Sequence, residues 1–270
     1  MTRNGRQDTS DEDIVYSRLA DGLAPIDPAP KPAQAVRERL LARAGRSAAA
    51  HAGLLTVRSR DGLWNPVREG VAMKLLWQGA RGNSVLIRLA ANARLPVHRH
   101  RWAEEGIVLD GDLYLGEQAL HPGDFHLSMP GSRHDHITSR GGGVAYLGGT
   151  SLGDRGGVLM ELLGGLLPHR GSPPLTRTLA DNRWRETAPG VEECVLRNDA
   201  SATTRLIRLA PGCTLAAAAM HGDEERLVVD GDAYFGDMLL QAGDFQVPAA
   251  EARPCAIESD GGALLLLRRA

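Results

Sequence analysis

The chain has 270 residues, which is enough for about two domains at the usual size of roughly 100–200 residues each. Its net charge of −2 gives no electrostatic reason to expect nucleic acid or an anionic membrane as a partner. The N-terminus has no apolar signal-peptide region, and no apolar run approaches the roughly 20 residues of a membrane span. Three widely spaced cysteines, Cys194, Cys213 and Cys255, favour reduced thiols, so we expect a soluble, cytoplasmic protein.

The first fifty residues differ in composition from the rest of the chain. An acidic turn after Ser10 begins a segment with apolar residues at helical spacing, and the proline-rich stretch Pro25–Pro32 ends it. A second helical pattern covers Ala33–Ala44. We therefore predict a short helical extension at the N-terminus.

The rest of the chain is an internal repeat. A shift of 120 residues aligns the two halves without a gap, from about 55–148 onto 175–268. The clearest matches are Leu86–Ala90 with Leu206–Ala210, Asp110–Asp112 with Asp230–Asp232, and Gly123–Phe125 with Gly243–Phe245. An ungapped match of this length indicates that one domain was duplicated.

Each repeat has the pattern of a small β-domain. Short apolar segments such as Ser84–Leu89 and Val144–Leu147 alternate with turns rich in Gly, Asp and Pro. The Asp-Gly pairs at 110–111 and 230–231 predict β-hairpins. About a hundred residues of such strands predict a sandwich or a jelly-roll barrel.

These patterns divide the chain into four segments. We predict a helical, proline-rich extension at 1–50, a first barrel at 51–155, a linker at 156–174 and a second barrel at 175–270. The expected fold class is all-β, with two tandem barrels behind the helical extension.

Six of the nine histidines fall between residues 98 and 136. His98 and His100 are two residues apart, so on a strand their rings lie on one face. Glu104 follows across a short loop, and His134 comes after the turn at Pro130-Gly131. Three imidazoles and one carboxylate that converge inside a barrel suit Zn²⁺, Fe²⁺, Mn²⁺ or Ni²⁺. Taken alone, the histidine pair could equally be two surface residues on a polar strand face.

The segment HRHRWAEEGIVLDGD, followed by HPGDFHLSMPGSRH, resembles the two motifs of the cupin superfamily. The first motif ends at Gly111, and the second runs from Gly123 to His134. Met129-Pro130-Gly131 stands where the general motif has Pro-x-Gly, a small departure. More narrowly, the pattern is similar to the cupin domain of ChrR-type anti-sigma factors. The resemblance implies that the barrels are cupin domains, with the double-stranded β-helix or jelly-roll fold.

The resemblance also implies a ligand set. In the ChrR-type family two histidines, a glutamate and a final histidine bind zinc, and the matching residues here are His98, His100, Glu104 and His134. Glu105 is a rival for the carboxylate, because the general cupin motif accepts either spacing. We expect one divalent ion per chain, with zinc first and iron, manganese or nickel as alternatives.

The second repeat lacks this set. The four ligand positions become, in order, Ala218, Met220, Glu224 and Pro254. We therefore predict a degenerate second barrel without a metal ion. His126 becomes Gln246, a polar exchange that predicts a solvent or hydrogen-bonding role for that position rather than a ligand role.

Two functions are compatible with such a site. The first is a regulatory or sensory module of the ChrR type, since the segment Leu19–Arg43 also resembles the connection between anti-sigma and cupin domains in that family. The chain lacks the His/Cys zinc pattern of the anti-sigma domain and has no cysteine before Cys194, so direct binding of a sigma factor is not the leading expectation. The second is a metal-dependent cupin dioxygenase that acts on a small organic substrate. Expected partners are a small molecule, a sigma-factor-related protein or a second copy of the chain.

Overall fold

The computed structural model describes residues 11–22, 30–154, 156, 172–217, 224–249, 252 and 254–270. The chain divides into two units, Met1–Ala49 and Ala50–Ala270. Helices α1 (Asp11–Gly22) and α2 (Pro30–Ala50) confirm the two predicted helices, the second of which is longer than expected. Ser10, the predicted cap, lies outside the described residues. No helix in the described ranges is long and apolar enough to cross a membrane.

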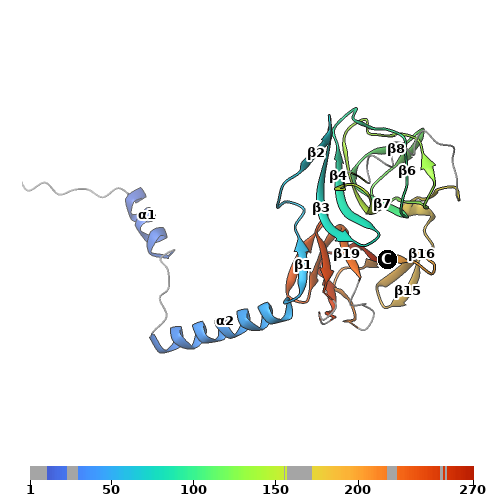
Figure 1. Ribbon diagram of the computed structural model, residues 1–270. Coiled ribbons are helices and arrows are strands. Elements are labelled where there is room, and N and C mark those ends of the chain that lie inside the picture. Colours follow the sequence, from blue (N-terminus) through green and yellow to red (C-terminus); the bar gives the residue numbers. More distant parts are fainter. Residues whose placement is uncertain are drawn as a thin grey trace, which may run out of the picture. The chain divides into compact units, whose positions relative to one another are not determined.

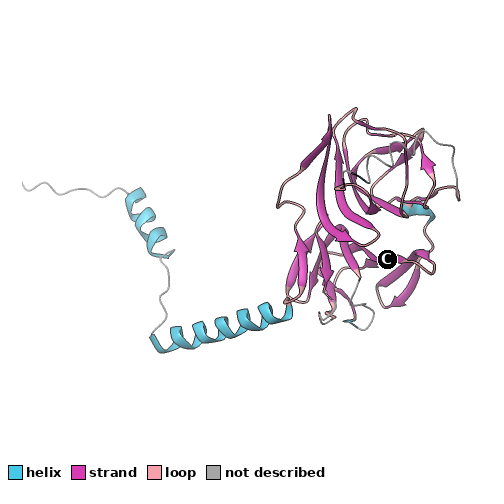
Figure 2. Cartoon of the chain, in the orientation of Figure 1, coloured by secondary structure: helices cyan, strands magenta, loops and turns pink. Residues whose placement is uncertain are grey.

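The second unit is built from strands, which confirms the predicted all-β fold of two tandem barrels (Figure 2). The strands of the first repeat are β1 (Leu54–Val57), β2 (Asn65–Arg68), β3 (Val71–Gly79), β4 (Gly82–Leu89), β5 (Arg94–Leu95), β6 (His98–Arg99), β7 (Glu104–Gly111), β8 (Leu113–Leu115), β9 (Gln118–Leu120), β10 (Phe125–Ser128), β11 (Arg133–His134), β12 (Ile137–Thr138) and β13 (Gly143–Thr150). The elements of the second repeat are β14 (Leu175–Arg177), the 3₁₀ turn η1 (Leu179–Asp181), β15 (Arg185–Ala188), β16 (Val191–Asn198), β17 (Thr203–Leu209), β18 (Cys213–Leu215), β19 (Glu225–Phe235), β20 (Met238–Gln241), β21 (Phe245–Pro248), β22 (Ile257–Ser259) and β23 (Ala263–Arg269).

In the part of the chain that the structure describes, the first barrel is formed by three sheets. Its large sheet has the order β14-β10-β7-β13-β4-β3-β2, and a smaller one has the order β5-β12-β8-β9. A two-stranded pair, β6 with β11, carries the HxH motif and His134. The second barrel has the main order β1-β21-β19-β23-β17-β16-β15, to which β18, β20 and β22 add a further layer.

The two repeats exchange their first strands. β1 pairs antiparallel with β21 of the second repeat, so in Figure 1 it lies among the strands of that barrel. β14, which corresponds to β1 after the shift of 120, pairs with β10 of the first repeat. Each barrel is therefore completed by a strand from the other repeat.

The recurring Gly-Asp-Phe motif holds these exchanged strands in place. One carboxylate oxygen of Asp244 accepts a hydrogen bond from the backbone N–H of Ser59 at 2.7 Å, just after β1. Asp124 accepts the same bond from Leu179 at 2.7 Å, just after β14. Ser59 and Leu179 are 120 residues apart, so the contact obeys the repeat symmetry. The motif recurs for a structural reason that applies to both barrels, with or without a metal ion.

The predicted hairpins at the Asp-Gly pairs are wrong. β19 runs from Glu225 to Phe235 straight through 230–231, and β7 and β8 pair with other strands instead of with each other. Gly111 and Gly231 instead have positive φ values of 72° and 74° beside irregularities in the register with β13 and β23. A Cβ on Gly111 would lie 2.0 Å from the carbonyl oxygen of Gly142, so close backbone approach requires glycine here.

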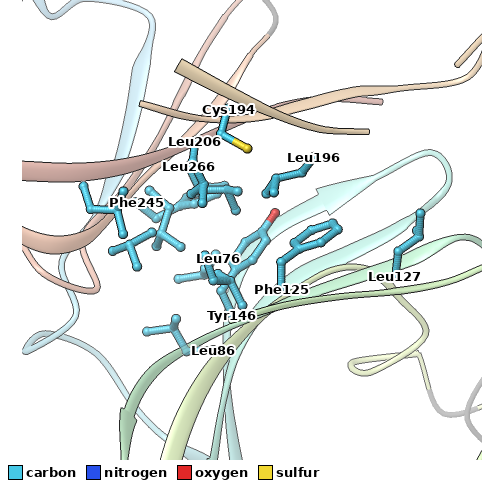
Figure 3. Close-up of a cluster of buried hydrophobic side chains, with 14 of the residues drawn as sticks. Leu76, Leu86, Phe125, Leu127, Tyr146, Cys194, Leu196, Leu206, Phe245 and Leu266 are labelled. Carbon is cyan, nitrogen blue, oxygen red and sulfur yellow. The ribbon is translucent and has the colours of Figure 1, made fainter. Parts of the chain in front are cut away.

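Three hydrophobic clusters hold the second unit together. One fills each barrel, and the third lies between them, where equivalent residues of the two repeats meet (Figure 3). Phe125 and its counterpart Phe245 are both fully buried in this shared cluster, and the rings of Tyr146 and Phe245 stack with centroids 6.2 Å apart. The barrels thus bury one common core in addition to their own.

We expect Asp244→Asn to lower the free energy of unfolding by about 1–3 kcal/mol at pH 7, since hydrogen bonds to a charged group are lost. Burial raises the pKa of Asp244, but hydrogen bonds from Ser59, Arg58 and Gln241 outweigh it and the pKa is lowered. Stability from a lowered carboxyl pKa is present above the unfolded value and is lost as pH falls through the folded value. The difference between wild type and variant should therefore shrink as the pH falls below the ordinary aspartate pKa.

Denaturant unfolding at several pH values would measure this effect. Asp230→Asn is the matched control, because Asp230 is an exposed aspartate of the same repeat. Equal stability of wild type and Asp244→Asn at pH 7 would contradict the role assigned to this carboxylate.

Candidate metal centre

His98 and His100 are held in place by backbone pairing. His98 is the register partner of His134, and the N–H of His100 donates to the carbonyl of Ser132 at 3.0 Å. The two imidazole rings lie edge to face, with centroids 4.8 Å apart. The strand spacing therefore brings both rings together, as the HxH pattern predicts.

The surroundings of His98 fix its tautomer. Nδ1 lies 3.0 Å from the carbonyl oxygen of Pro96, which can only accept a hydrogen bond, so Nδ1 carries the proton. The lone pair that could bind a metal is then on Nε2. Metal-binding histidines commonly donate their other ring N–H to a carbonyl in this way.

His100 is buried in the neutral form. The residue is 2% exposed. The pKa of His100 is lowered to about 3, mainly by burial and to a smaller extent by the charges of the neighbouring His98 and His126. An imidazole must be neutral to bind a metal, so at neutral pH His100 already has the required protonation state.

Glu104, at the start of β7, completes the group. Its Oε1 lies 3.7 Å from Nδ1 of His100, and the residue is 6% exposed. One ligand atom from each of His98, His100 and Glu104 lies within 4.8 Å of the others. Two imidazoles and a carboxylate at this spacing fit a divalent cation of the zinc or iron type. Among the residues that the structure describes, this is the group of histidine and carboxylate side chains whose ligand atoms lie close enough together to hold a metal ion.

His134, the fourth predicted ligand, stands on β11 beside His98. Its side chain lies outside the described part of the structure. The ligand role of His134 therefore stays a prediction.

Glu105, the rival carboxylate, lies on the opposite face of β7. It has no exposed surface and accepts hydrogen bonds from Arg197 Nη1 at 2.8 Å and Arg268 Nε at 3.2 Å, both in the second repeat. The hydroxyl of Thr204 donates a further bond. Glu105 is committed to the contact between the barrels, away from the histidines.

His126 is close to the centre, although the sequence pattern gave it no site role. It lies opposite Gly106 on β7 and hydrogen-bonds to Thr176 Oγ1 at 2.9 Å and Ser128 Oγ at 3.1 Å, in agreement with the predicted hydrogen-bonding role. Burial lowers its pKa to about 4, while the charge of Glu104 opposes that shift. The alternation of side chains along β10 could have predicted this position. It places His126 on the inward face of the strand, opposite Gly106.

A cavity of about 340 Å³ opens beside the candidate ligands. His98 and Glu104 form part of its wall. Most of the remaining lining is apolar and consists of Val67, Leu95, Pro96, Ile137, Leu147 and Leu152. A molecule in this cavity would contact the metal-binding group directly.

The second barrel has internal charges in the region that corresponds to the candidate metal site. Glu224, the counterpart of Glu104, is 2% exposed and pairs with Arg205 at 3.1 Å. Arg226 stands where the first repeat has Gly106 and places a buried guanidinium in the same region. Pro254 is exposed, whereas Ala218 and Met220 lie outside the described residues. The retained carboxylate is thus paired with an arginine side chain.

We expect the two neighbouring glutamates to respond differently to conversion to glutamine. Glu104→Gln should lower metal content while the unfolding free energy of chelated protein changes little. Glu105→Gln should keep the metal but lower that free energy by about 3–5 kcal/mol, since two buried guanidinium groups lose their anionic partner. Elemental analysis and denaturant unfolding with chelator measure the two effects. Metal loss from the Glu105 variant alone would reverse the assignment.

We expect His134→Ala to lose metal and leave both barrels folded, because the second repeat builds its barrel with proline at that position. The metal then adds stability only through binding, about 2.7 kcal/mol at a hundredfold excess of free ion over Kd. Circular dichroism and thermal melting with and without chelator would test this. A variant unfolded at 25 °C would show that the ion is needed for folding.

Comparisons with known proteins agree with this architecture. Residues 52–150 match the family described as the ChrR cupin-like domain. No curated protein matches the chain.

Several solved structures are similar in fold. A candidate dioxygenase from Nostoc punctiforme is 14% identical, with a TM-score of 0.56 over 80% of this chain and 82% of that one. A candidate glyoxylate-induced protein from Pseudomonas aeruginosa is 18% identical, with a TM-score of 0.55 over 80% and 88%. Oxalate decarboxylase from Lactobacillus farciminis is 14% identical, with a TM-score of 0.55 over 79% and 85%. At these identities the likeness concerns the fold alone.

The match over the first repeat, the duplication and the barrel topology agree on one conclusion. The first barrel, over residues 52–150, is a ChrR cupin-like domain, and the chain has the fold of two tandem barrels.

Proposed function

We propose that the first barrel binds one divalent metal ion, zinc in the first place, through His98, His100, Glu104 and His134. We further propose that the chain is a regulatory or sensory module, in which a small molecule binds beside this ion. The observation that carries the proposal is the apolar cavity, whose wall includes His98 and Glu104.

The protein residues provide a mainly apolar receptor beside the proposed metal ligands. The hydrogen bond to Pro96 orients His98, and burial keeps His100 neutral. When bound, the ion supplies Lewis acidity to whatever reaches it through the cavity. Apart from the proposed ligands, the ionisable residues described in the lining are Arg68 and Glu69, from the exposed end of β2 and the turn after it. A lining with so few proton-transfer groups favours binding over multi-step catalysis.

A metal-dependent dioxygenase is the second candidate, and the size of the cavity favours it. A space of about 340 Å³ beside the ligand group can hold a small organic substrate. The same residues would then hold Fe²⁺, Mn²⁺ or Ni²⁺ with open coordination positions, whereas four protein ligands would close a tetrahedral zinc site.

The partners and the location are also proposals. The small molecule is assigned to the cavity. A protein partner, either sigma-factor-related or a second copy of the chain, would suit the exposed apolar side chains Leu40 and Leu41 of α2. The three cysteines are free thiols, in keeping with the proposed cytoplasmic location.

We expect elemental analysis of protein purified without added metal to give one equivalent of zinc per chain, because the second repeat has no histidine at the three matching ligand positions. His98→Ala should remove this equivalent, and Gln78→Ala, an exposed change on β3, should retain it. Two equivalents, of which one survives the loss of His98, would contradict a single site.

The identity of the metal separates the two functions. Zinc without oxygen consumption supports the sensory function. Binding of a small molecule would then be measured as a change in the melting temperature of the protein. Iron, manganese or nickel with oxygen consumption in the presence of a substrate would favour the dioxygenase.

A further inference from the structure

The cavity beside the candidate metal ligands joins a polar wall to an apolar one. His98 and Glu104 belong to the polar wall, and most of the other lining side chains are apolar. Two of these, Leu95 and Ile137, are register partners on β5 and β12, and each is 9% exposed. A molecule in this cavity would therefore hold a polar group beside the candidate ligands and bury an apolar body against the opposite wall.

The charge of the site selects the polar group, in a step that rests on the proposed metal ion. A divalent ion brings two positive charges, Glu104 brings one negative charge, and neutral imidazoles bring none, so one positive charge is left unbalanced. Among the described residues of the lining, the other ionised side chains are Arg68 and Glu69, whose charges cancel. An unbalanced charge beside an apolar wall is unfavourable, so a ligand with a single negative charge is preferred.

The volume of the cavity sets the size of that ligand. The cavity measures about 340 Å³. A water molecule takes up about 30 Å³ in the liquid, so the space corresponds to roughly ten non-hydrogen atoms. A carboxylate with a medium-length hydrocarbon chain, such as octanoate, has this size.

A second, smaller cavity of about 40 Å³ lies inside the hydrophobic cluster of the first barrel. Its apolar lining includes Val108, Leu113, Leu115, Leu120 and Ala145. Glu104, Ile137 and Leu147 line both cavities, so their side chains form part of the partition between them. Leu147 reaches across to β7, because a Cβ on Gly106 would lie 3.1 Å from its Cδ2.

We propose that the first barrel binds a monocarboxylate with an apolar chain of about the length of octanoate, and that Leu147 sets the upper limit of chain length. The carboxylate lies at the end of the cavity formed by His98 and Glu104, and the chain lies against Leu95 and Ile137. The side chain of Leu147 keeps the end of the chain out of the smaller cavity.

Isothermal titration calorimetry of the full-length protein at pH 7 tests the chain length, with the metal content measured on the same sample. The probes are butanoate, hexanoate, octanoate, decanoate and dodecanoate. Each added methylene buries more apolar surface, so Kd should fall about fourfold per methylene while the cavity fills. Beyond octanoate we expect no further gain in affinity.

Two further probes test the single negative charge. Octan-1-ol lacks the anionic group, and octanedioate places a second carboxylate against the apolar wall. Each should bind at least about tenfold more weakly than octanoate. Chelated protein should also lose octanoate binding, because Glu104 then leaves the site with a negative charge.

A variant of the partition tests the role of Leu147. Leu147→Ala joins the two cavities and should move the limit from octanoate to decanoate or beyond. Leu120→Ala is the matched control, since Leu120 lines the smaller cavity alone and its loss should leave the limit unchanged. Circular dichroism checks that both variants are folded. If Leu147→Ala is unfolded, the smaller change Leu147→Val takes its place, with the same direction of shift expected.

The outcomes separate this inference from the proposed function. One equivalent of metal with octanoate binding no tighter than octan-1-ol would overturn the inference and leave the metal site standing, whereas protein without metal would overturn both. A limit that stays at octanoate in the folded Leu147 variant would overturn the role of this side chain.

Discussion

The rest of the second unit depends on the exchange of first strands between the repeats. β1 and β14 each complete the partner barrel, and a buried aspartate binds the backbone that follows each of them. This exchange holds the barrels against each other and buries a shared core between them. It also fixes the two faces of β7, so that Glu104 faces the histidines and Glu105 faces Arg197 and Arg268. The geometry of the metal-binding group therefore depends on contacts made by the second barrel.

The two barrels balance the same buried carboxylate by different means. In the first, Glu104 lies beside neutral imidazoles, an arrangement that suits an external divalent cation. In the second, the side chain of Arg205 pairs with Glu224, and Arg226 adds a positive charge. The first barrel therefore has a group of side chains that could bind a metal ion, whereas the second carries its positive charges on arginine side chains.

Sequence reasoning predicted the duplication, the tandem barrels and the grouping of His98, His100 and Glu104, because repeat matches and strand periodicity are local signals. It did not predict the exchange of strands, since the two repeats would look the same in sequence whichever barrel each first strand joined. The Asp-Gly pairs marked irregular strands instead of hairpins because their glycines accommodate a close backbone approach. Alternation along β7 could have separated Glu104 from Glu105: Val108 shares the inward face with the former, and Ile107 shares the outward face with the latter. The replacement of Gly106 by Arg226 was visible in the repeat alignment, but its meaning required the knowledge that this position is buried.

The strand exchange has a consequence for assembly. Because each barrel needs a strand that is encoded next to the other barrel, the repeats are not independent folding units. Separated halves expressed together would each carry the strand that the other requires, which favours reassembly in trans. By the same logic, a second copy of the chain can donate β14 to the first barrel through the same backbone pairing. A domain-swapped dimer would then need no new interface, and the length of the connection between the repeats would set the balance between the closed monomer and the swapped form.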